Sequence, residues 1–214
     1  MTSPLEQRLR RALAHTSAAP PRPVCRLKLP LDVDRLLLPA LRSTLRPASV
    51  LVPLLRRPQG LTVLLTQRTA HLRSHAGQIS FPGGRREDAD ESAAHAALRE
   101  AHEEVGLPPD AVEVIGYLDD YPTVSRYLVT PVVGIVAQCP GVRPCAHEVA
   151  QVFEVPADFA LDPGNFESKA FSRSGLNVPF FELNHGGWRI WGATAGMLHN
   201  LAEKLAAVPA AERA

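Results

Sequence analysis

Three glutamates near the middle of the chain are spaced so that a helix would carry them on one face. Glu100, Glu103 and Glu104 stand at positions i, i+3 and i+4 within Leu98–Leu107, and residues at that spacing project together from a helix. Their charge is unfavourable there, because the helix dipole disfavours anions near its C-terminal end and like charges at i and i+4 repel. Bound Mg²⁺ or Mn²⁺ would turn this repulsion into coordination, since both ions prefer oxygen ligands. The alternative is an acidic helix face that is exposed to solvent.

A glycine-bearing loop precedes this helix. Phe81–Gly84 reads Phe-Pro-Gly-Gly, and paired glycines let a backbone approach a ligand closely and present its N–H and C=O groups. On its own such a sequence indicates only a turn. Before an acidic helix, it predicts a space between loop and carboxylates for a phosphate chain and its metal.

In combination, the run Gly84–Leu107 resembles the Nudix box, the signature of a family of hydrolases. Its second half, Arg-Glu-apolar-x-Glu-Glu-x-Gly-apolar, is matched here by Arg99, Glu100, Ala101, Glu103, Glu104, Gly106 and Leu107. The first half departs from the pattern, because one extra residue lies between Gly84 and Glu91. Glu91 keeps the family's distance to Arg99, whereas Asp90 keeps the family's distance to the glycine. The sequence leaves open which of the two takes the place of the family's early glutamate.

The residues before the box resemble the coenzyme A pyrophosphatase subgroup of this family. Its motif is Leu-Leu-Thr-x-Arg-(Ser or Ala)-x-x-x-Arg-x-x-x-Gly-x-x-x-Phe-Pro-Gly-Gly, and Leu64–Gly84 departs from it only at Thr69. The later run Trp191–Ala195 also resembles this subgroup. The resemblance implies the Nudix α/β/α sandwich, an α/β fold with a mixed sheet between helices. It also implies that water attacks the pyrophosphate of coenzyme A, giving phosphopantetheine and adenosine 3',5'-bisphosphate.

The resemblance assigns the metal site to the box. Glu100, Glu103 and Glu104 would hold one or more Mg²⁺ or Mn²⁺ ions, with the carbonyl of Gly84 as a further ligand. These ions would neutralise phosphate charge and activate water. Arg99 would contribute to catalysis by orienting the glutamates through ion pairs.

The general base and the substrate contacts are expected around this metal site. The base is either a glutamate of the box, Glu103, or Glu148 on a later loop between two expected strands. Arg68 and Arg73 are candidates for binding substrate phosphates, because a guanidinium matches phosphate geometry. The backbone of Gly83 is the third expected substrate contact.

Hydrophobic patterning and turn residues predict the elements that position these residues. The clearest is a helix over 91–105, with Asp90 or Ser92 as its cap and Gly106 as its left-handed end. The expected strands cover 49–55, 61–66, 112–118, 128–136, 152–155, 178–183 and 188–191, the last two joined by a hairpin turn at 184–187. Further helices are expected over 5–13, 33–41 and 193–208.

The length of the chain, 214 residues, suits one well-buried core. We expect a Nudix hydrolase domain over 48–208, followed by a tail over 209–214. Residues 1–47, which are partly helical and Pro-rich, are expected to form an extension that packs on the core as a lid or a dimer contact. The sequence does not decide between a monomer and a homodimer.

Composition excludes several classes of partner. The 23 basic and 22 acidic residues nearly cancel to a net charge of +1, which gives no reason to expect nucleic acid as a partner. No run is long and apolar enough to span a bilayer. The three cysteines form no metal-binding or redox pattern, which is typical of reduced thiols in the cytoplasm. We therefore expect a cytoplasmic enzyme whose partner is a small molecule, coenzyme A.

Two other functions remain open at this stage. The first is a Nudix hydrolase that acts on another nucleoside diphosphate derivative, such as a nucleotide sugar or a dinucleotide. The second is an inactive Nudix domain that only binds its ligand. The complete set of three glutamates argues against the inactive domain, because a binding domain gains nothing from their mutual repulsion.

Overall fold

The computed structural model describes residues 2–25, 44–71, 75–138, 141–173 and 176–209. Its centre is a pair of parallel strands, β1 (Arg46–Arg57) and β7 (Tyr127–Val136). β2 (Gly60–Arg68) pairs antiparallel with β1, and β5 (Val112–Tyr117) pairs antiparallel with β7. The shorter or outer strands of this sheet are β3 (Ile79–Ser80) and β8 (Val149–Pro156) on β2, β4 (Gly83–Arg85) on β1, and β6 (Tyr121–Pro122) on β7. The sheet is therefore mixed, as expected.

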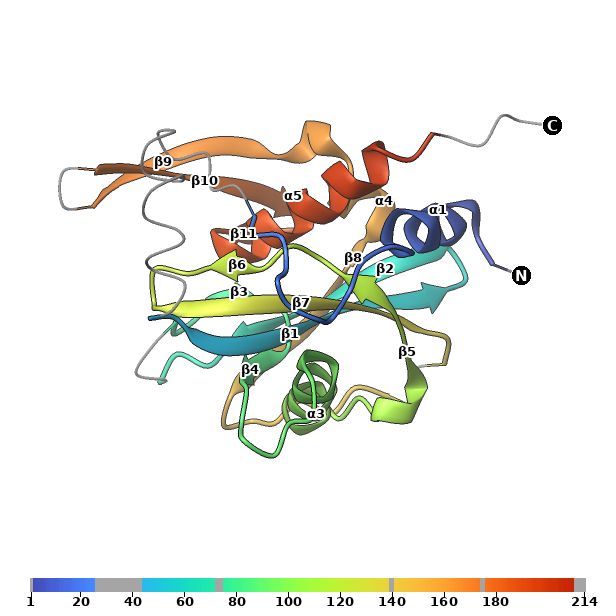
Figure 1. Cartoon of the computed structure of the whole chain (residues 1–214), viewed down its shortest axis with the longest axis horizontal. Coiled ribbons are helices and arrows are strands. Elements are labelled where there is room, and N and C mark those ends of the chain that lie inside the picture. Colours follow the sequence, from blue (N-terminus) through green and yellow to red (C-terminus); the bar gives the residue numbers. More distant parts are fainter. Residues whose placement is uncertain (1, 26–43, 72–74, 139–140, 174–175, 210–214) are drawn as a thin grey trace.

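Helices cover both faces of this sheet. Figure 1 shows α3 (Ala93–Val105) on one side of β1 and β7, and α5 (Ala193–Ala206) with α1 (Pro4–Leu13) on the other. The short α4 (Ala157–Ala160) packs on the same side as α5. This is the α/β arrangement with a sheet between helices that the sequence predicts.

Strand β1 serves both layers, because successive side chains of a strand point to opposite faces. Leu51 and Leu55 pack with α3, in a cluster that contains Ala97, Ala101 and Val105. The apolar stripe of the predicted helix therefore docks on the sheet as expected.

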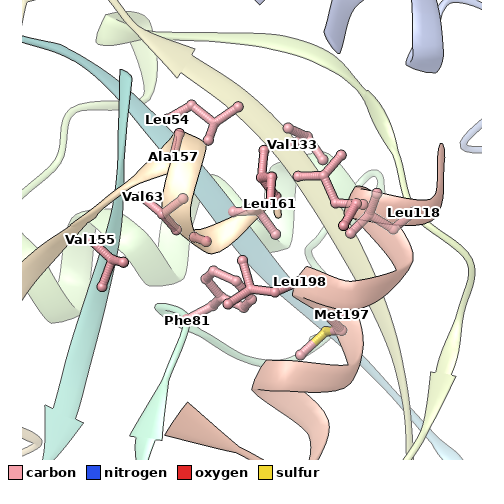
Figure 2. Close-up of a cluster of buried hydrophobic side chains, with 14 of the residues drawn as sticks. Leu54, Val63, Phe81, Leu118, Val133, Val155, Ala157, Leu161, Met197 and Leu198 are labelled. Atoms are coloured by element: carbon pink, nitrogen blue, oxygen red, sulfur yellow. The ribbon is translucent and has the colours of Figure 1, made fainter. Parts of the chain in front are cut away.

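The opposite face of β1 contributes Val52 and Leu54 to the larger core. Figure 2 shows Leu54 there with side chains from α5, Met197 and Leu198, and with Phe81 from the loop that precedes β4. The loop that is expected at the site is thus anchored in the core by its own phenylalanine.

A second sheet lies beyond α5, with β10 (Leu176–His185) between β9 (Glu167–Arg173) and β11 (Trp188–Trp191). All its pairings are antiparallel, and His185 pairs with Trp188. Gly186 and Gly187 form the hairpin turn at φ 56° and 83°, a conformation that favours glycine. The predicted hairpin is confirmed. Strand β9 was not predicted, because its sequence is too polar to show an apolar alternation.

The helix of the box begins later than expected. We predicted residues 91–105, but α3 starts at Ala93, because Ser92 is the N-cap and its side chain accepts a hydrogen bond from the N–H of His95 at 3.0 Å. The predicted end is confirmed, with Gly106 at φ 68°. Short 3₁₀ turns at Pro109–Ala111 and Pro163–Asn165 were not predicted.

The N-terminal helix packs on the core of the domain. The expected helix over 5–13 is confirmed by α1, whose Leu9 and Leu13 are buried in the cluster that also contains α5. Further along, Val24 forms a β-bridge to Asp120. The helix expected over 33–41 lies outside the described residues, and the domain boundaries and a lid or dimer role for the extension stay predictions. No helix in the part of the chain described here has the length and apolar character that crossing a membrane requires.

Candidate active site

The glycine loop and the acidic helix meet at one end of the sheet. In the pairing of β4 with β1, Gly83 lies opposite Val50 and Gly84 opposite Ser49, and α3 packs against both strands. A Cβ at Gly83 would lie 2.5 Å from the backbone of β1, and φ is 154° there. A Cβ at Gly84 would lie 2.6 Å from the carboxylate of Glu100. The first position therefore requires glycine, and the second brings the loop directly against a carboxylate that a side chain there would displace.

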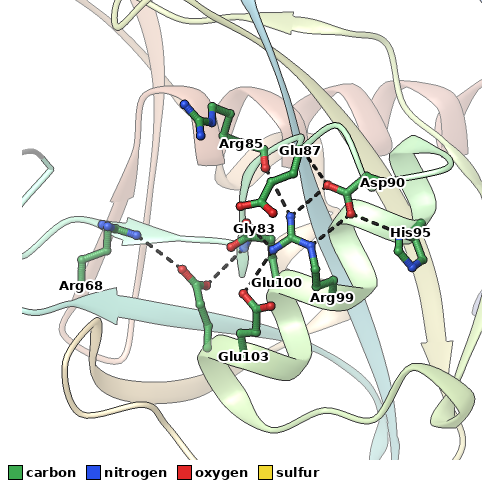
Figure 3. Close-up of polar contacts among 10 residues, drawn as sticks. Arg68, Gly83, Arg85, Glu87, Asp90, His95, Arg99, Glu100 and Glu103 are labelled. Atoms are coloured by element: carbon green, nitrogen blue, oxygen red, sulfur yellow. Dashed lines mark hydrogen bonds and ion pairs between the residues drawn. The ribbon is translucent and has the colours of Figure 1, made fainter.

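Glu104 is the buried member of the three glutamates. Its side chain accepts a hydrogen bond from the N–H of Gly83 at 3.1 Å, and Nη1 of Arg68 lies 3.5 Å from the other carboxylate oxygen (Figure 3). Burial raises the pKa of Glu104 to about 7, and the charges of Glu148 and Glu100 act in the same direction. A carboxylate that is costly to ionise in this setting is a frequent mark of a functional site.

Glu100 is half-buried and Glu103 is exposed. Nη1 of Arg99 donates to both, at 3.0 Å to Glu100 and at 3.1 Å to Glu103. Burial also raises the pKa of Glu100, and the charges of Glu103 and Glu148 add to that effect. The charge of Glu103 thus disfavours ionisation of Glu100, and the charge of Glu100 disfavours ionisation of Glu104.

Arg99 is itself held by a buried carboxylate. Its Nε and Nη2 lie 3.0 and 2.9 Å from the two oxygens of Asp90, and this pair holds the pKa of Asp90 well below its usual range. The backbone N–H of Glu87 also donates to Asp90, and Nδ1 of His95 lies 3.1 Å from it (Figure 3). Glu91 is exposed. In space, therefore, Asp90 and not Glu91 is the acidic residue beside the arginine of the box.

The loop that carries Glu148 reaches this cluster, as expected. The N–H of Thr69 donates to the carbonyl of Glu148 at 2.9 Å, and Arg68 lies opposite Val149 in the pairing of β2 with β8. The charge of Glu148 raises the pKa of two of the glutamates on α3, so the carboxylate lies within electrostatic range of them. Arg68 is the last residue of β2 and lies beside this loop. Its partner in the prediction, Arg73, lies outside the described residues.

The side chains in their present orientations do not surround a single point. Within the described ranges, no three His, Cys, Asp or Glu side chains lie together as a metal-binding group. Glu100 and Glu103 both turn toward Arg99, whereas Glu104 turns toward Gly83. Coordination of one ion by all three would therefore require rotation of side chains.

One polar residue beside the site was not predicted as part of it. Ser49 is fully buried on β1, on the face that carries Leu51 and Leu55 toward α3. The signal was present in the sequence, because the four nearest positions on that face of the strand, Pro47, Leu51, Pro53 and Leu55, are apolar.

Comparison with known proteins places this geometry in a family. The family model of the NUDIX domain matches residues 45–173. The uncharacterized Nudix hydrolase NudL of Escherichia coli K12 is 47% identical over 171 residues, which cover 78% of this chain and 88% of NudL. The protein of the same name in Shigella flexneri is 47% identical over 165 residues, which cover 77% of this chain and 85% of that protein.

Solved structures of the same family are more distant. The crystal structure of the M. smegmatis Nudix hydrolase RenU is 24% identical with a TM-score of 0.48, and the match covers 78% of this chain and 90% of RenU. The NUDIX domain of Shewanella oneidensis NrtR, solved with ADP ribose, is 22% identical with a TM-score of 0.42, and the match covers 53% of this chain and 74% of that one.

Proposed function

This chain belongs to the Nudix family of hydrolases, and we propose that it hydrolyses the pyrophosphate bond of coenzyme A or of a coenzyme A derivative. As a Nudix hydrolase, it acts on a nucleoside diphosphate derivative, which is a small molecule. Attack of water on one phosphorus would break the anhydride bond and release phosphopantetheine and adenosine 3',5'-bisphosphate. The observation that carries the choice of substrate is the motif over Leu64–Gly84, which resembles the coenzyme A subgroup and supplies Arg68 to the carboxylate cluster.

Nudix hydrolases generally use divalent metal ions, and the residues present fit such an ion. Glu100, Glu103 and Glu104 offer oxygen donors that repel one another, and Gly84 leaves space where a Cβ would meet a carboxylate. The three side chains, with the carbonyl of Gly84, would hold Mg²⁺ or Mn²⁺, and our proposal leaves the choice of ion open. When bound, such an ion neutralises phosphate charge and makes a water molecule easier to deprotonate.

The substrate phosphates would be held on the side of the cluster where β2 ends. Arg68 lies 3.5 Å from Glu104, a contact that a phosphate group would replace with a stronger, bidentate one through two of its oxygens. The backbone of Gly83 would lie against the phosphate chain. A Cβ at this position would meet the backbone of β1. Arg73 remains a second candidate by its place in the motif.

Arg99 would act by position. Asp90 fixes two of its nitrogens, and its third nitrogen donates to Glu100 and Glu103. A guanidinium that is held in this way limits where the two glutamates turn. We therefore propose that Arg99 orients the glutamates and that Asp90 orients Arg99.

The general base is proposed to be Glu148, with Glu103 as the alternative. Both carboxylates are exposed and so keep access to water. Glu148 is supported by its fixed backbone, which accepts from Thr69 and donates to the carbonyl of Cys145 at 3.0 Å. It is not a proposed metal ligand, so its carboxylate remains available to take a proton from the attacking water.

The test is hydrolysis of coenzyme A by the purified protein with Mg²⁺ or Mn²⁺, with products separated by chromatography. A nucleotide sugar and a dinucleotide are assayed in parallel, and the Glu103→Gln variant serves as the impaired control. We expect phosphopantetheine and adenosine 3',5'-bisphosphate from coenzyme A, with little turnover of the parallel substrates. Preferential turnover of a parallel substrate would sink the coenzyme A proposal and keep the hydrolase, and no turnover at all would favour an inactive binding domain.

A further inference from the structure

We infer that Ser49 is a positioning residue for Glu100, and that its hydroxyl donates a hydrogen bond to that carboxylate when the carboxylate turns from Arg99 toward a bound divalent cation. The inference rests on the metal site of the proposed function, although not on the choice of substrate. It assigns a role to a residue of β1, outside the Nudix box.

The two faces of β1 pack against different layers of the fold. Side chains alternate along β1, and Leu51 and Leu55 belong to the cluster formed with α3, whereas Ala48, Val52 and Leu54 belong to the opposite cluster. Ser49 therefore points toward α3, the helix that carries Glu100.

At Ser49, strand β1 pairs with the glycine loop. Ser49 lies directly opposite Gly84 in the antiparallel pair of β1 and β4, and the Cβ positions of such partners share a face about 5 Å apart. A Cβ at Gly84 would lie 2.6 Å from Cδ and both oxygens of Glu100. The side chain of Ser49 thus stands beside the space that the carboxylate of Glu100 occupies, and only the absence of a side chain at Gly84 leaves that approach open.

The hydroxyl of Ser49 is shielded from solvent. Ser49 is 0% exposed, and among the described residues its Oγ has no hydrogen-bond partner. A buried hydroxyl without a partner is unfavourable, and most such groups in proteins are paired. Alanine would fill the same position without that cost, so the hydroxyl is best explained by a partner that it gains when Glu100 turns.

A competing hydrogen-bond partner lies on β7, which pairs with the other edge of β1. Ser49 is in register with Thr130 of β7, whose hydroxyl donates to Asp120 at 2.9 Å. Thr130 could accept a hydrogen bond from Ser49, which would make the serine part of the packing and not of the metal site. The experiment must separate these two roles.

The experiment measures binding of Mn²⁺ alone to the full-length protein, by calorimetric titration and by the electron paramagnetic resonance signal of the ion. For Ser49→Ala we expect affinity to fall about tenfold, the lower range for loss of a residue that orients a metal ligand. The unfolding temperature without metal should stay unchanged or rise, because an unpaired buried hydroxyl has been removed. Ser49→Thr should recover most of the affinity.

Thr194→Val is the matched control. It removes a buried hydroxyl that is already paired, to the carbonyl of Ile79 at 2.9 Å, so it should lower stability and leave Mn²⁺ affinity unchanged. Unchanged affinity in Ser49→Ala would overturn the inference, and a drop in stability alone would assign the hydroxyl to Thr130. If the unmodified protein bound no Mn²⁺, the proposed metal site and this inference would fail together. If it bound Mn²⁺ but did not hydrolyse coenzyme A, only the substrate proposal would fail.

Discussion

Two buried glutamates of this molecule have opposite electrostatic environments. Glu6 of α1 is 1% exposed and Glu104 of α3 is 4% exposed. Glu6 accepts hydrogen bonds from Arg56 at 2.7 and 2.9 Å and from Arg10 at 2.9 and 3.1 Å, and Arg56 above all lowers its pKa. Glu104 has one arginine at 3.5 Å, and burial raises its pKa to about 7.

The difference separates a structural carboxylate from one that is prepared for a ligand. The cluster of Glu6 joins α1 to β1, and through Arg10 to Glu113 of β5, so its charges are balanced within the protein. The cluster of Glu104 carries excess negative charge next to the glycine loop, and a bound divalent cation would neutralise that charge. Burial alone does not set the pKa of a carboxyl group, because the number of fixed cationic donors decides its direction.

The largest effect on activity is expected from Glu104→Gln. We expect kcat/KM to fall by about 100- to 1,000-fold, the usual cost of removing a group that stabilises charge in the transition state. The amide oxygen can still accept from Gly83, so the fold should persist. Steady-state kinetics and circular dichroism measure the two effects, and near-normal activity would exclude Glu104 from the metal site.

The same variant tests the pH dependence of stability. The pKa of Glu104 is about 7 in the folded protein, against a usual value of 4.5. Between these values the folded state binds more protons than the unfolded chain, so stability should fall as pH rises from 4.5 to 7. Denaturant unfolding without metal should show this slope, and Glu104→Gln should reduce it. Glu6 has the opposite sign, because its lowered pKa gives stability at neutral pH that is lost in acid.

Glu148→Gln separates the proposed general base from the proposed metal ligands. If Glu148 is the general base, kcat should fall by about 100-fold while KM changes little, in the range typical of general base catalysis. The loss of its negative charge should also lower the pKa of Glu104, which shifts the stability slope to lower pH. A kcat within twofold of the unmodified enzyme would transfer the role to Glu103. The control is Glu91→Gln, which also removes one negative charge from an exposed glutamate.

Glu6→Gln should act on stability and not on chemistry. It removes charge-assisted hydrogen bonds to Arg10 and Arg56, and we expect a loss of about 2 kcal/mol in the free energy of unfolding. The kcat of the folded enzyme should be unchanged. Denaturant titration and kinetics at low temperature measure both, and a large drop in kcat would mean that α1 is coupled to the site.

Asp90→Asn is expected to have a smaller effect on catalysis than Glu104→Gln or Glu148→Gln, about tenfold on kcat/KM, because it acts through Arg99. The bidentate contact to Arg99 is lost, so Glu100 and Glu103 are oriented less firmly. Glu91→Gln is the matched variant one residue away and should behave like the unmodified enzyme. The reverse result would give the place of the family's early glutamate to Glu91.

Much of the fold follows from local patterns in the sequence. The long strands of the central sheet, the closing helix and the end of α3 at Gly106 were predicted, because alternation, helical spacing and a glycine that adopts positive φ are local signals. The two-residue strands β3 and β6 were not predicted, because they exist only through pairing with longer strands. The start of α3 was placed two residues early, because Asp90 and Ser92 are both good caps and only the fold showed that Asp90 binds Arg99.

The family, the acidic face of the helix and the glycine loop were all recognisable from residue type and spacing along one chain. The environment of each carboxyl group, in contrast, depends on the folded structure. That structure buries Glu104 beside Gly83, leaves Glu103 exposed and gives Asp90 to Arg99. It also places Ser49 across from Gly84. The physical reason is that pKa and hydrogen bonding depend on burial and on neighbours from distant segments, which spacing along the chain does not encode.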